Sequence, residues 1–184
     1  MSKLTKSLMA ALIMAGSAVQ AQNSDPETGL NMGAPAAPEV YVKATHGDWT
    51  VQCVEVESAE RCEIHYPLTA PNGSSIGQLA FFPVPEGGEA VAGVRAFVPL
   101  GVLLSEPLLI AVDDGVPRAY PYTVCDQQVC MAQFGFRAQD LEAFVTGTKG
   151  IVAITPFQSA DNGPMMIEVN LEGFGDAVAS MNGE

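Results

Sequence analysis

The fold of this chain is decided by Trp49 to Tyr66, which reads W-T-V-Q-C-V-E-V-E-S-A-E-R-C-E-I-H-Y, two alternating runs around an acidic centre. Side chains alternate between the two faces of a strand, so the stretch can fold back with Cys53 opposite Cys62. Two further pairs then share that face: Val51 with Ile64, and Trp49 with Tyr66. A slip of one residue would break all three pairs. The stretch therefore predicts a β-hairpin that a disulfide can close.

The other features of this hairpin are polar. Its opposite face would carry Thr50, Gln52, Glu63 and His65, which we expect to point toward water. Its loop would carry the acidic residues Glu55, Glu57 and Glu60. Carboxylate oxygens can hold calcium, but the spacing of an EF-hand loop is absent, so a solvated acidic loop is the favoured interpretation.

The beginning of the chain predicts export. Lys3 and Lys6 precede an apolar run from Leu8 to Ala18, and small residues follow at Val19-Gln20-Ala21. This order is typical of a secretory signal peptide, and the apolar run is too short for a permanent membrane span. We therefore expect residues 1–21 to be a cleaved signal peptide and the mature protein to be periplasmic or secreted, with no transmembrane segment.

Export changes the interpretation of the cysteines and of the charge. The four cysteines, Cys53, Cys62, Cys125 and Cys130, would meet an oxidising compartment, where an even number favours disulfides. Local pairs, Cys53 with Cys62 and Cys125 with Cys130, need no long-range contact, but the two crossed connectivities stay open. Without Lys3 and Lys6, six basic residues face 21 acidic ones, a net charge of −15. This charge excludes nucleic-acid binding and favours a cationic partner.

The mature chain divides into a linker and one domain. Residues 22–42 are rich in proline, glycine, alanine and polar residues without an apolar period, which indicates a flexible linker. Residues 43–184 have the length and apolar content of a single domain with its own core.

The body of this domain alternates short apolar runs with turn residues. Expected strands cover residues 76–84, 90–98, 108–112, 116–124, 149–157 and 164–171. A second hairpin is expected at Y-T-V-C-D-Q-Q-V-C-M-A-Q-F, with Val124 facing Met131 beside the second cysteine pair. Ala138 to Val145 predicts a short amphipathic helix, and a terminal helix should follow Gly173. These patterns predict an all-β, disulfide-stapled antiparallel β-sandwich with one or two short helices.

With these segments placed, the chain resembles the invasion associated locus B family of exported bacterial proteins. The resemblance lies in G-D-W-T-V-Q-C at 47–53, Cys62, the strand 108–113, Y-T-V-C-D-Q-Q-V-C at 122–130, the helix near Leu141 and L-E-G-F at 171–174. It covers nearly the whole mature domain. It implies an envelope protein, since the founding members are linked to entry of pathogens into host cells. It brings no catalytic residues.

No pattern in the sequence predicts catalysis. The cysteine spacings differ from the C-x-x-C of thiol oxidoreductases and from paired zinc ligands. The two histidines, His46 and His65, are interpreted as surface residues, and no nucleophile-elbow or metalloprotease motif is present. We therefore expect no enzyme, no metal and no cofactor. The alternative is a periplasmic hydrolase or carbohydrate-acting enzyme that uses paired carboxylates.

The favoured function is binding of an envelope or extracellular protein, or of another envelope component, by a sandwich face or by exposed loops. Loops on a rigid scaffold are common recognition sites. The candidate binding residues are the acidic residues of three expected loops: Glu55, Glu57, Glu60, Glu86, Glu89 and Asp126.

Overall fold

The computed structural model describes residues 38–56 and 59–183. The expected signal peptide, residues 22–37 of the expected linker, and Glu57 lie outside the described residues. Strand β1 (Val40–His46) begins before the expected domain boundary at residue 43. Residues 40–42 therefore belong to a strand, and the expectation that they form part of the linker was wrong.

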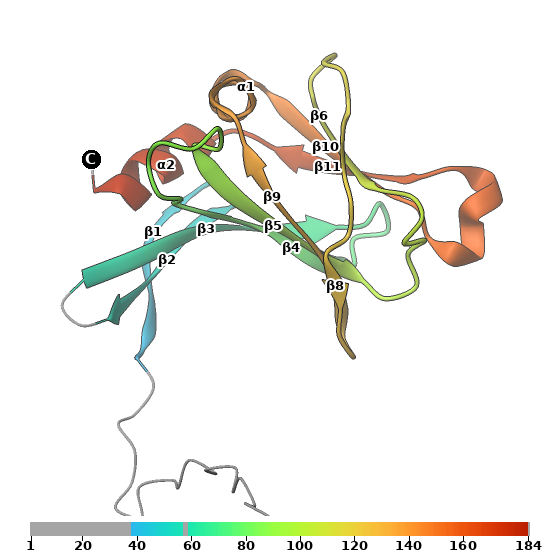
Figure 1. Ribbon diagram of the computed structural model, residues 1–184, viewed down its shortest axis with the longest axis horizontal. Helices are drawn as coiled ribbons and strands as arrows, with labels where there is room; N and C mark the ends of the chain where they lie inside the picture. Colours follow the sequence, from blue (N-terminus) through green and yellow to red (C-terminus); the bar gives the residue numbers. More distant parts are fainter. Residues whose placement is uncertain (1–37, 57–58, 184) are drawn as a thin grey trace, which may run out of the picture. The chain divides into compact units, whose positions relative to one another are not determined.

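The larger sheet contains seven antiparallel strands in the order β1-β2-β3-β4-β5-β9-β8 (Figure 1). After β1, its strands are β2 (Trp49–Val56), β3 (Ala59–Thr69), β4 (Ser75–Phe82), β5 (Ala92–Pro99), β8 (Val124–Cys125) and β9 (Val129–Phe136). The first five follow chain order, as expected of strands joined by hairpin connections.

The smaller sheet contains four strands in the order β11-β10-β6-β7. Its strands are β6 (Leu108–Val112), β7 (Arg118–Tyr120), β10 (Lys149–Ile154) and β11 (Met165–Asn170). Two short helices, α1 (Ala138–Thr146) and α2 (Phe174–Asn182), and a 3₁₀ helix, η1 (Phe157–Asn162), complete the domain. Figure 1 shows the two sheets as layers, with α1 and α2 near one end. The expected all-β sandwich with two short helices is confirmed.

Both expected disulfides are present. In the first hairpin, Cys53 faces Cys62 and Val51 faces Ile64, as expected. The rings of Trp49 and Tyr66 lie 4.5 Å apart between centroids, which completes the third pair. Cys53–Cys62 and Cys125–Cys130 are bonded, so both crossed connectivities are excluded.

The loop expected inside the first hairpin is much shorter than predicted. Strand β2 continues to Val56 and β3 begins at Ala59, and Glu55 pairs with Glu60 across the ladder. The placement of these two glutamates in a loop was therefore wrong. An alternating polar and apolar run continues a strand as readily as a loop, so composition alone did not reveal this extension.

The expected strand from 116 to 124 is divided between the sheets. Arg118–Tyr120 pairs with β6 in the smaller sheet, and Val124–Cys125 pairs with β9 in the larger one. Pro117 and Pro121 flank the first piece. Proline has no backbone N–H for a ladder bond, so the run cannot continue as one regular strand.

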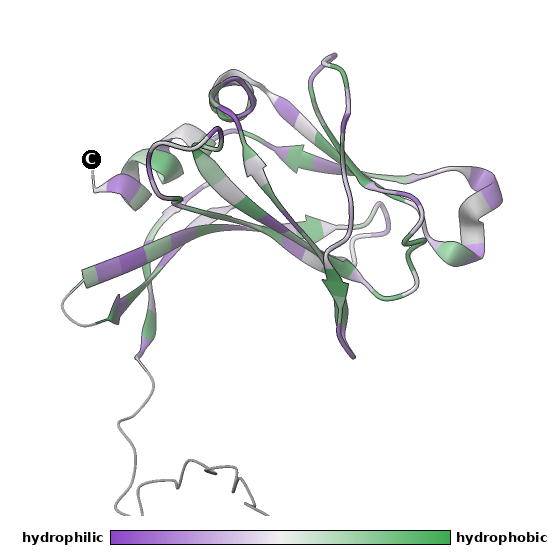
Figure 2. Cartoon of the chain, viewed as in Figure 1, coloured by the Kyte–Doolittle hydropathy of each residue, from purple (hydrophilic) through white to green (hydrophobic). Residues whose placement is uncertain are grey.

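An aromatic cluster fills the space between the layers. Trp49, Phe81, Phe136, Phe144 and Phe174 come from β2, β4, β9 and both helices, and each is at most 2% exposed. Neighbouring rings have centroid distances such as 4.7 Å for Trp49–Phe174 and 5.0 Å for Phe136–Phe144. Figure 2 shows the alternation of apolar and polar segments along the strands that brings such residues inward. Among the described residues, no helix has the length and apolar character needed to cross a membrane.

Candidate binding surfaces

The outer face of the larger sheet is the side turned away from the buried core. The register places every second residue of its strands there, between the buried residues of the inner face. The larger apolar side chains at these positions include Val40, Val42, Val54, Phe82, Phe97, Val124 and Met131. Antiparallel sheets usually expose a mainly polar second face, so this apolar content is unusual.

Acidic side chains are nearly absent from the outer face. The chain contains 21 acidic residues, yet Glu63 is the one acid at an outward position of the described strands of this sheet. Both terminal nitrogens of Arg95 lie 3.3 Å from the Glu63 carboxylate oxygens. The same guanidinium lies 4.3 Å from the centroid of the Phe82 ring. The single acid is therefore neutralised by a cation that also stacks on an aromatic ring.

A hollow of about 760 Å³ lies on this face, lined mainly by apolar side chains that include Val40, Val54, Phe82 and Val84. His65 lies beside Glu63, with 3.9 Å between its Nε2 and a carboxylate oxygen. Burial lowers the pKa of His65, an effect that Glu63 opposes and Arg95 reinforces. The imidazole is therefore neutral at pH 7. The expectation that Thr50, Gln52, Glu63 and His65 point toward water holds only in part, because His65 and Glu63 are half-buried.

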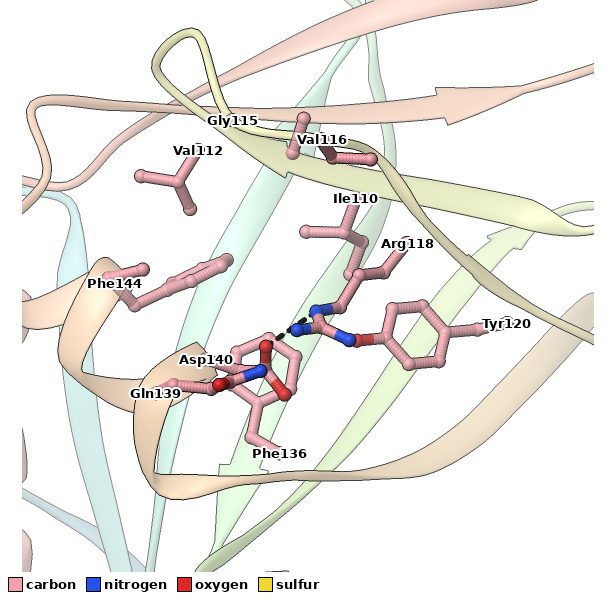
Figure 3. A pocket seen from close by; sticks show the side chains of 12 residues that line it. Ile110, Val112, Gly115, Val116, Arg118, Tyr120, Phe136, Gln139, Asp140 and Phe144 are labelled. Carbon is pink, nitrogen blue, oxygen red and sulfur yellow. Dashed lines mark ion pairs between the residues drawn. The ribbon is translucent and has the colours of Figure 1, made fainter.

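A second candidate site is a pocket of about 200 Å³ between α1, β6, β7 and β9 (Figure 3). Its inner wall is apolar and aromatic, with Ile110, Val112, Phe136 and Phe144. Arg118 reaches from β7 toward α1, where its Nε lies 2.6 Å from Oδ1 of Asp140. The other oxygen of Asp140 accepts the backbone N–H of Arg137, 3.2 Å away, at the start of α1.

A hollow of about 500 Å³ adjoins this pocket and shares the Arg118–Asp140 ion pair. Arg137 lines the hollow and lies 3.4 Å from Glu89, in a pair that is mostly exposed. Tyr120 is stacked on Phe134 with 3.7 Å between ring centroids. This stacking fixes the position of Tyr120 in the wall that the pocket and the adjoining hollow share. The arrangement brings two arginines to the edge of an apolar pocket.

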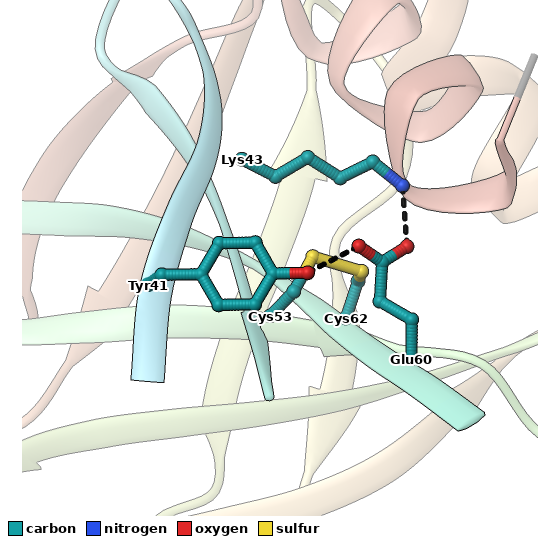
Figure 4. A network of polar contacts seen from close by, with 5 residues as sticks. All are labelled: Tyr41, Lys43, Cys53, Glu60 and Cys62. Atoms are coloured by element: carbon teal, nitrogen blue, oxygen red, sulfur yellow. Dashed lines mark hydrogen bonds and ion pairs between the residues drawn. A yellow bond between two sulfur atoms is a disulfide. The ribbon is translucent and has the colours of Figure 1, made fainter. Parts of the chain in front are cut away.

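The acidic residues that were predicted from the sequence and that the structure describes lie apart from both sites, except Glu89. Glu60 accepts hydrogen bonds from the Tyr41 hydroxyl at 2.5 Å and from Lys43 Nζ at 2.6 Å (Figure 4). Lys43 and then Tyr41 lower the pKa of Glu60, and the bond to Glu60 raises the pKa of Tyr41 to about 12. Glu60 therefore ties β1 to the first hairpin.

Two further acidic positions have structural explanations. Asp126 accepts the backbone N–H groups of Gln128 and Val129 at 2.7 and 2.8 Å, and these bonds lower its pKa. It thereby forms the turn between β8 and β9. Glu86 is exposed in the connection between β4 and β5. Glu60 also lies close to Cys53 and Cys62, but both sulfur atoms are in the disulfide and offer no thiolate to a metal.

Sequence reasoning missed three arrangements. The outer face was not predicted because its apolar residues occur singly, between core residues of the same strands. The Arg118–Asp140 pair joins residues from separate elements, and no local pattern predicts it. His46, interpreted as a surface residue, is half-buried, with its Nε2 2.9 Å from the hydroxyl of Ser180 on α2.

Comparison with known proteins places the chain in a family. Residues 49–182 match the family described as invasion associated locus B (IalB) protein. The chain belongs to the IalB family. Two curated relatives, invasion protein B homologs from Brucella abortus strain 2308 and from Brucella abortus biovar 1 strain 9-941, are each 25% identical over 137 residues, covering 74% of this chain and 77% of theirs.

A solved structure supports the fold. The crystal structure of invasion associated protein B from Bartonella henselae aligns with a TM-score of 0.62 and 21% identity. The alignment covers 80% of this chain and 96% of that one. The match of residues 49–182 to the family confirms the IalB resemblance inferred from the cysteine-bearing strands.

Proposed function

We propose that this IalB-family protein is exported to the bacterial envelope and acts there, without catalysis, by binding another envelope or extracellular protein through the outer face of its larger sheet. Export is supported by the two disulfides, which form and persist in oxidising compartments, and by the signal-like beginning of the sequence. The partner that fits this face is a protein surface of mainly apolar character and low charge.

The observation that carries this proposal is the composition of the outer face. In a chain of net charge −13, this face has one acidic strand residue, and Arg95 neutralises it. Depletion of acidic residues, together with Phe, Met and Arg side chains, is the composition that distinguishes the centres of protein interfaces from other surfaces. Phe82, Phe97, Met131 and Arg95 supply those residue types here.

The hydrolase alternative gains no support from the described pockets. A glycosidase of the common type needs two carboxyl groups facing one cleft. In the described part of the chain, two pockets have Asp140 as their acidic lining residue, one has Glu63 and one has Glu86. Asp140 and Glu63 are moreover held in ion pairs with arginines.

The test compares one substitution on two sheet faces. Met131→Glu places a charge on β9 in the outer face, where Met131 pairs with Phe97 and Val124, whereas Met166→Glu places the same charge on β11, where Met166 is 51% exposed. Tagged full-length variants are crosslinked in cells of the native bacterium, and the captured proteins are identified and quantified. We expect Met131→Glu to reduce capture at least about tenfold, the effect of burying an unpaired charge in an interface, and Met166→Glu to leave capture unchanged.

The same experiment separates the outer face from the acidic residues predicted from the sequence. Binding by an apolar face should persist at high salt, whereas contacts of Glu55, Glu86 or Glu89 should weaken as the Debye length falls. Equal capture by wild type and Met131→Glu, with both Met variants folded, would show that the outer face is not the binding surface. Turnover of a glycan or ester by the purified protein, abolished by changing one carboxylate, would refute the non-catalytic function.

A further inference from the structure

We propose that the pocket beside the Arg118–Asp140 ion pair binds a small carboxylate that carries one apolar group, such as an aryl or branched alkyl group. The apolar group would occupy the pocket in Figure 3, and the carboxylate would lie in the adjoining hollow against Arg118 and Arg137. This site lies on α1 and β7, so it is separate from the outer face and does not depend on the function proposed above.

The size and lining of the pocket set the apolar part of the ligand. A closed apolar cavity of about 150 Å³ is known to accept benzene. The pocket here has about 200 Å³ and is lined by Ile110, Val112, Phe136, Phe144 and the β-carbon of Ala143. It therefore has room for one aromatic ring or one branched aliphatic group.

The charges at the mouth set the polar part of the ligand. The described domain has six basic residues, and two of them, Arg118 and Arg137, line the hollow next to the apolar pocket. Arg118 is held by Asp140, whose side chain is only 10% exposed, while the side chain of Arg118 remains 43% exposed. Asp140 thus orients the Arg118 side chain and leaves part of it open to an incoming acceptor.

Arg137 is the cation most readily available to a ligand. Its present partner is Glu89, at 3.4 Å, and the two side chains are 59% and 87% exposed. Exposed ion pairs of this kind contribute little, so a ligand carboxylate can displace Glu89 at small cost. Asp140 is less suited to a cationic ligand, because the Arg118 guanidinium already neutralises its charge.

The test uses phenylacetate and its amide, phenylacetamide, as a matched pair of probes. Two-dimensional NMR of the ¹⁵N-labelled mature domain measures both the dissociation constant and the residues affected. We expect phenylacetate to bind with a dissociation constant on the order of 0.1–1 mM, since ligands of this size have few contacting atoms. Shifts should centre on α1, β6 and β7, and the amide should bind about tenfold more weakly because it lacks the charge.

Two variants and two controls assign the parts of the site. Arg137→Gln should weaken phenylacetate about three- to tenfold and leave phenylacetamide unchanged. Ala143→Leu, which fills the pocket from a helix that tolerates leucine, should weaken both probes at least about tenfold. The controls are Glu142→Gln, an exposed neighbour on α1, and Arg61→Gln, an exposed arginine on the outer face; both should bind like wild type.

Three results would overturn the proposal: equal binding of the acid and the amide, shifts confined to another surface, or unchanged phenylacetate affinity in Arg137→Gln. Because Arg137 is exposed, the last result does not depend on whether Ala143→Leu folds. A further arm identifies the source of the ligand. Tighter binding of N-acetylphenylalanine than of phenylacetate assigns the site to the C-terminus of a peptide, and the reverse order assigns it to a free small acid.

Discussion

At the scale of single residues, Tyr66, which is buried, and Tyr122, which is half-buried, differ in whether their hydroxyl groups have a hydrogen-bond partner. The Tyr66 hydroxyl accepts the backbone N–H of Asn170 at 2.9 Å and so links the two sheets. The hydroxyl of Tyr122 is buried and has no hydrogen-bond partner among the described residues. A satisfied polar group stabilises a fold, whereas an unsatisfied one carries the cost of its lost hydration.

Removing each hydroxyl should therefore change stability in opposite directions. Tyr66→Phe should lower the free energy of unfolding by about 1 kcal/mol, because Asn170 loses its acceptor. Tyr122→Phe should raise it by about 1 kcal/mol, because a buried hydroxyl without a partner is removed. Urea unfolding at pH 7 measures both. A loss of stability in Tyr122→Phe would mean that its hydroxyl is bonded in solution.

The same two tyrosines predict how stability depends on alkaline pH. Burial is the main cause that raises the pKa of Tyr66, and burial raises the pKa of Tyr122 to about 12. The unfolded chain loses these protons near pH 10, before the folded chain does. The contribution of these two tyrosines to stability should therefore be constant below about pH 10 and be lost toward pH 12. Unfolding curves from pH 8 to 12 should show a smaller fall in Tyr122→Phe than in wild type.

At the scale of elements, the first residues of the edge strand β1 are exposed, and Glu60 adds side-chain bonds to the ladder that pairs this strand with β2. Val40, Tyr41 and Val42 are exposed, while Glu60 bonds Tyr41 and Lys43. Glu60→Lys should therefore raise amide hydrogen exchange along β1. Glu55→Lys should not, because Glu55 faces Glu60 across the ladder and its reversal replaces a like-charge pair by an opposite pair. Faster exchange of β1 in both variants would contradict the role assigned to Glu60.

The two disulfides should differ in what they contribute. Each closes a short loop, with sequence separations of 9 for Cys53–Cys62 and 5 for Cys125–Cys130. Loop-closure entropy then gives about 2–3 kcal/mol for the first and about 2 kcal/mol for the second. Both cysteines of the first are buried, whereas Cys125 is only half-buried. The variant Cys53→Ala/Cys62→Ala should therefore unfold at lower urea than Cys125→Ala/Cys130→Ala; the reverse order would contradict this account.

The strands and helices were predictable where residues close together in the sequence determine them. The register of the first hairpin, strand β6 and helix α1 follow from alternation, turn residues and a 3.6-residue period within short windows. Strand β1 was missed because its V-Y-V stretch follows a proline-rich segment and one edge strand buries little. The split of 116–124 was missed because only the neighbouring strands show which sheet each half joins.

The candidate sites were less predictable than the elements, for a related reason. An acidic residue is visible in a sequence, but its partner is not, so Glu60 and Asp126 were indistinguishable from free acids. The outer face and the Arg118–Asp140 pocket arise from residues on several strands and one helix. The spacing of these residues in the sequence follows no regular period, so the sequence does not predict that they lie close together.

At the scale of the whole molecule, the processing of the chain stays a prediction. Cleavage after Ala21 should leave Gln22 at the N-terminus and raise the net negative charge by removing Lys3 and Lys6. The intact mass of the protein from the periplasmic fraction checks both the site and the compartment. A mass that retains residues 1–21 would contradict the export on which the proposed function depends.

The placement of the two disulfides has a consequence for how the protein matures. Each bond joins adjacent strands of one hairpin, β2 with β3 and β8 with β9, and neither crosses between the sheets. Correct thiol pairing therefore requires only that each hairpin close, and not that the sandwich assemble first. A dithiol oxidase acting on the emerging chain should suffice, and loss of a disulfide isomerase should leave the yield of native protein nearly unchanged.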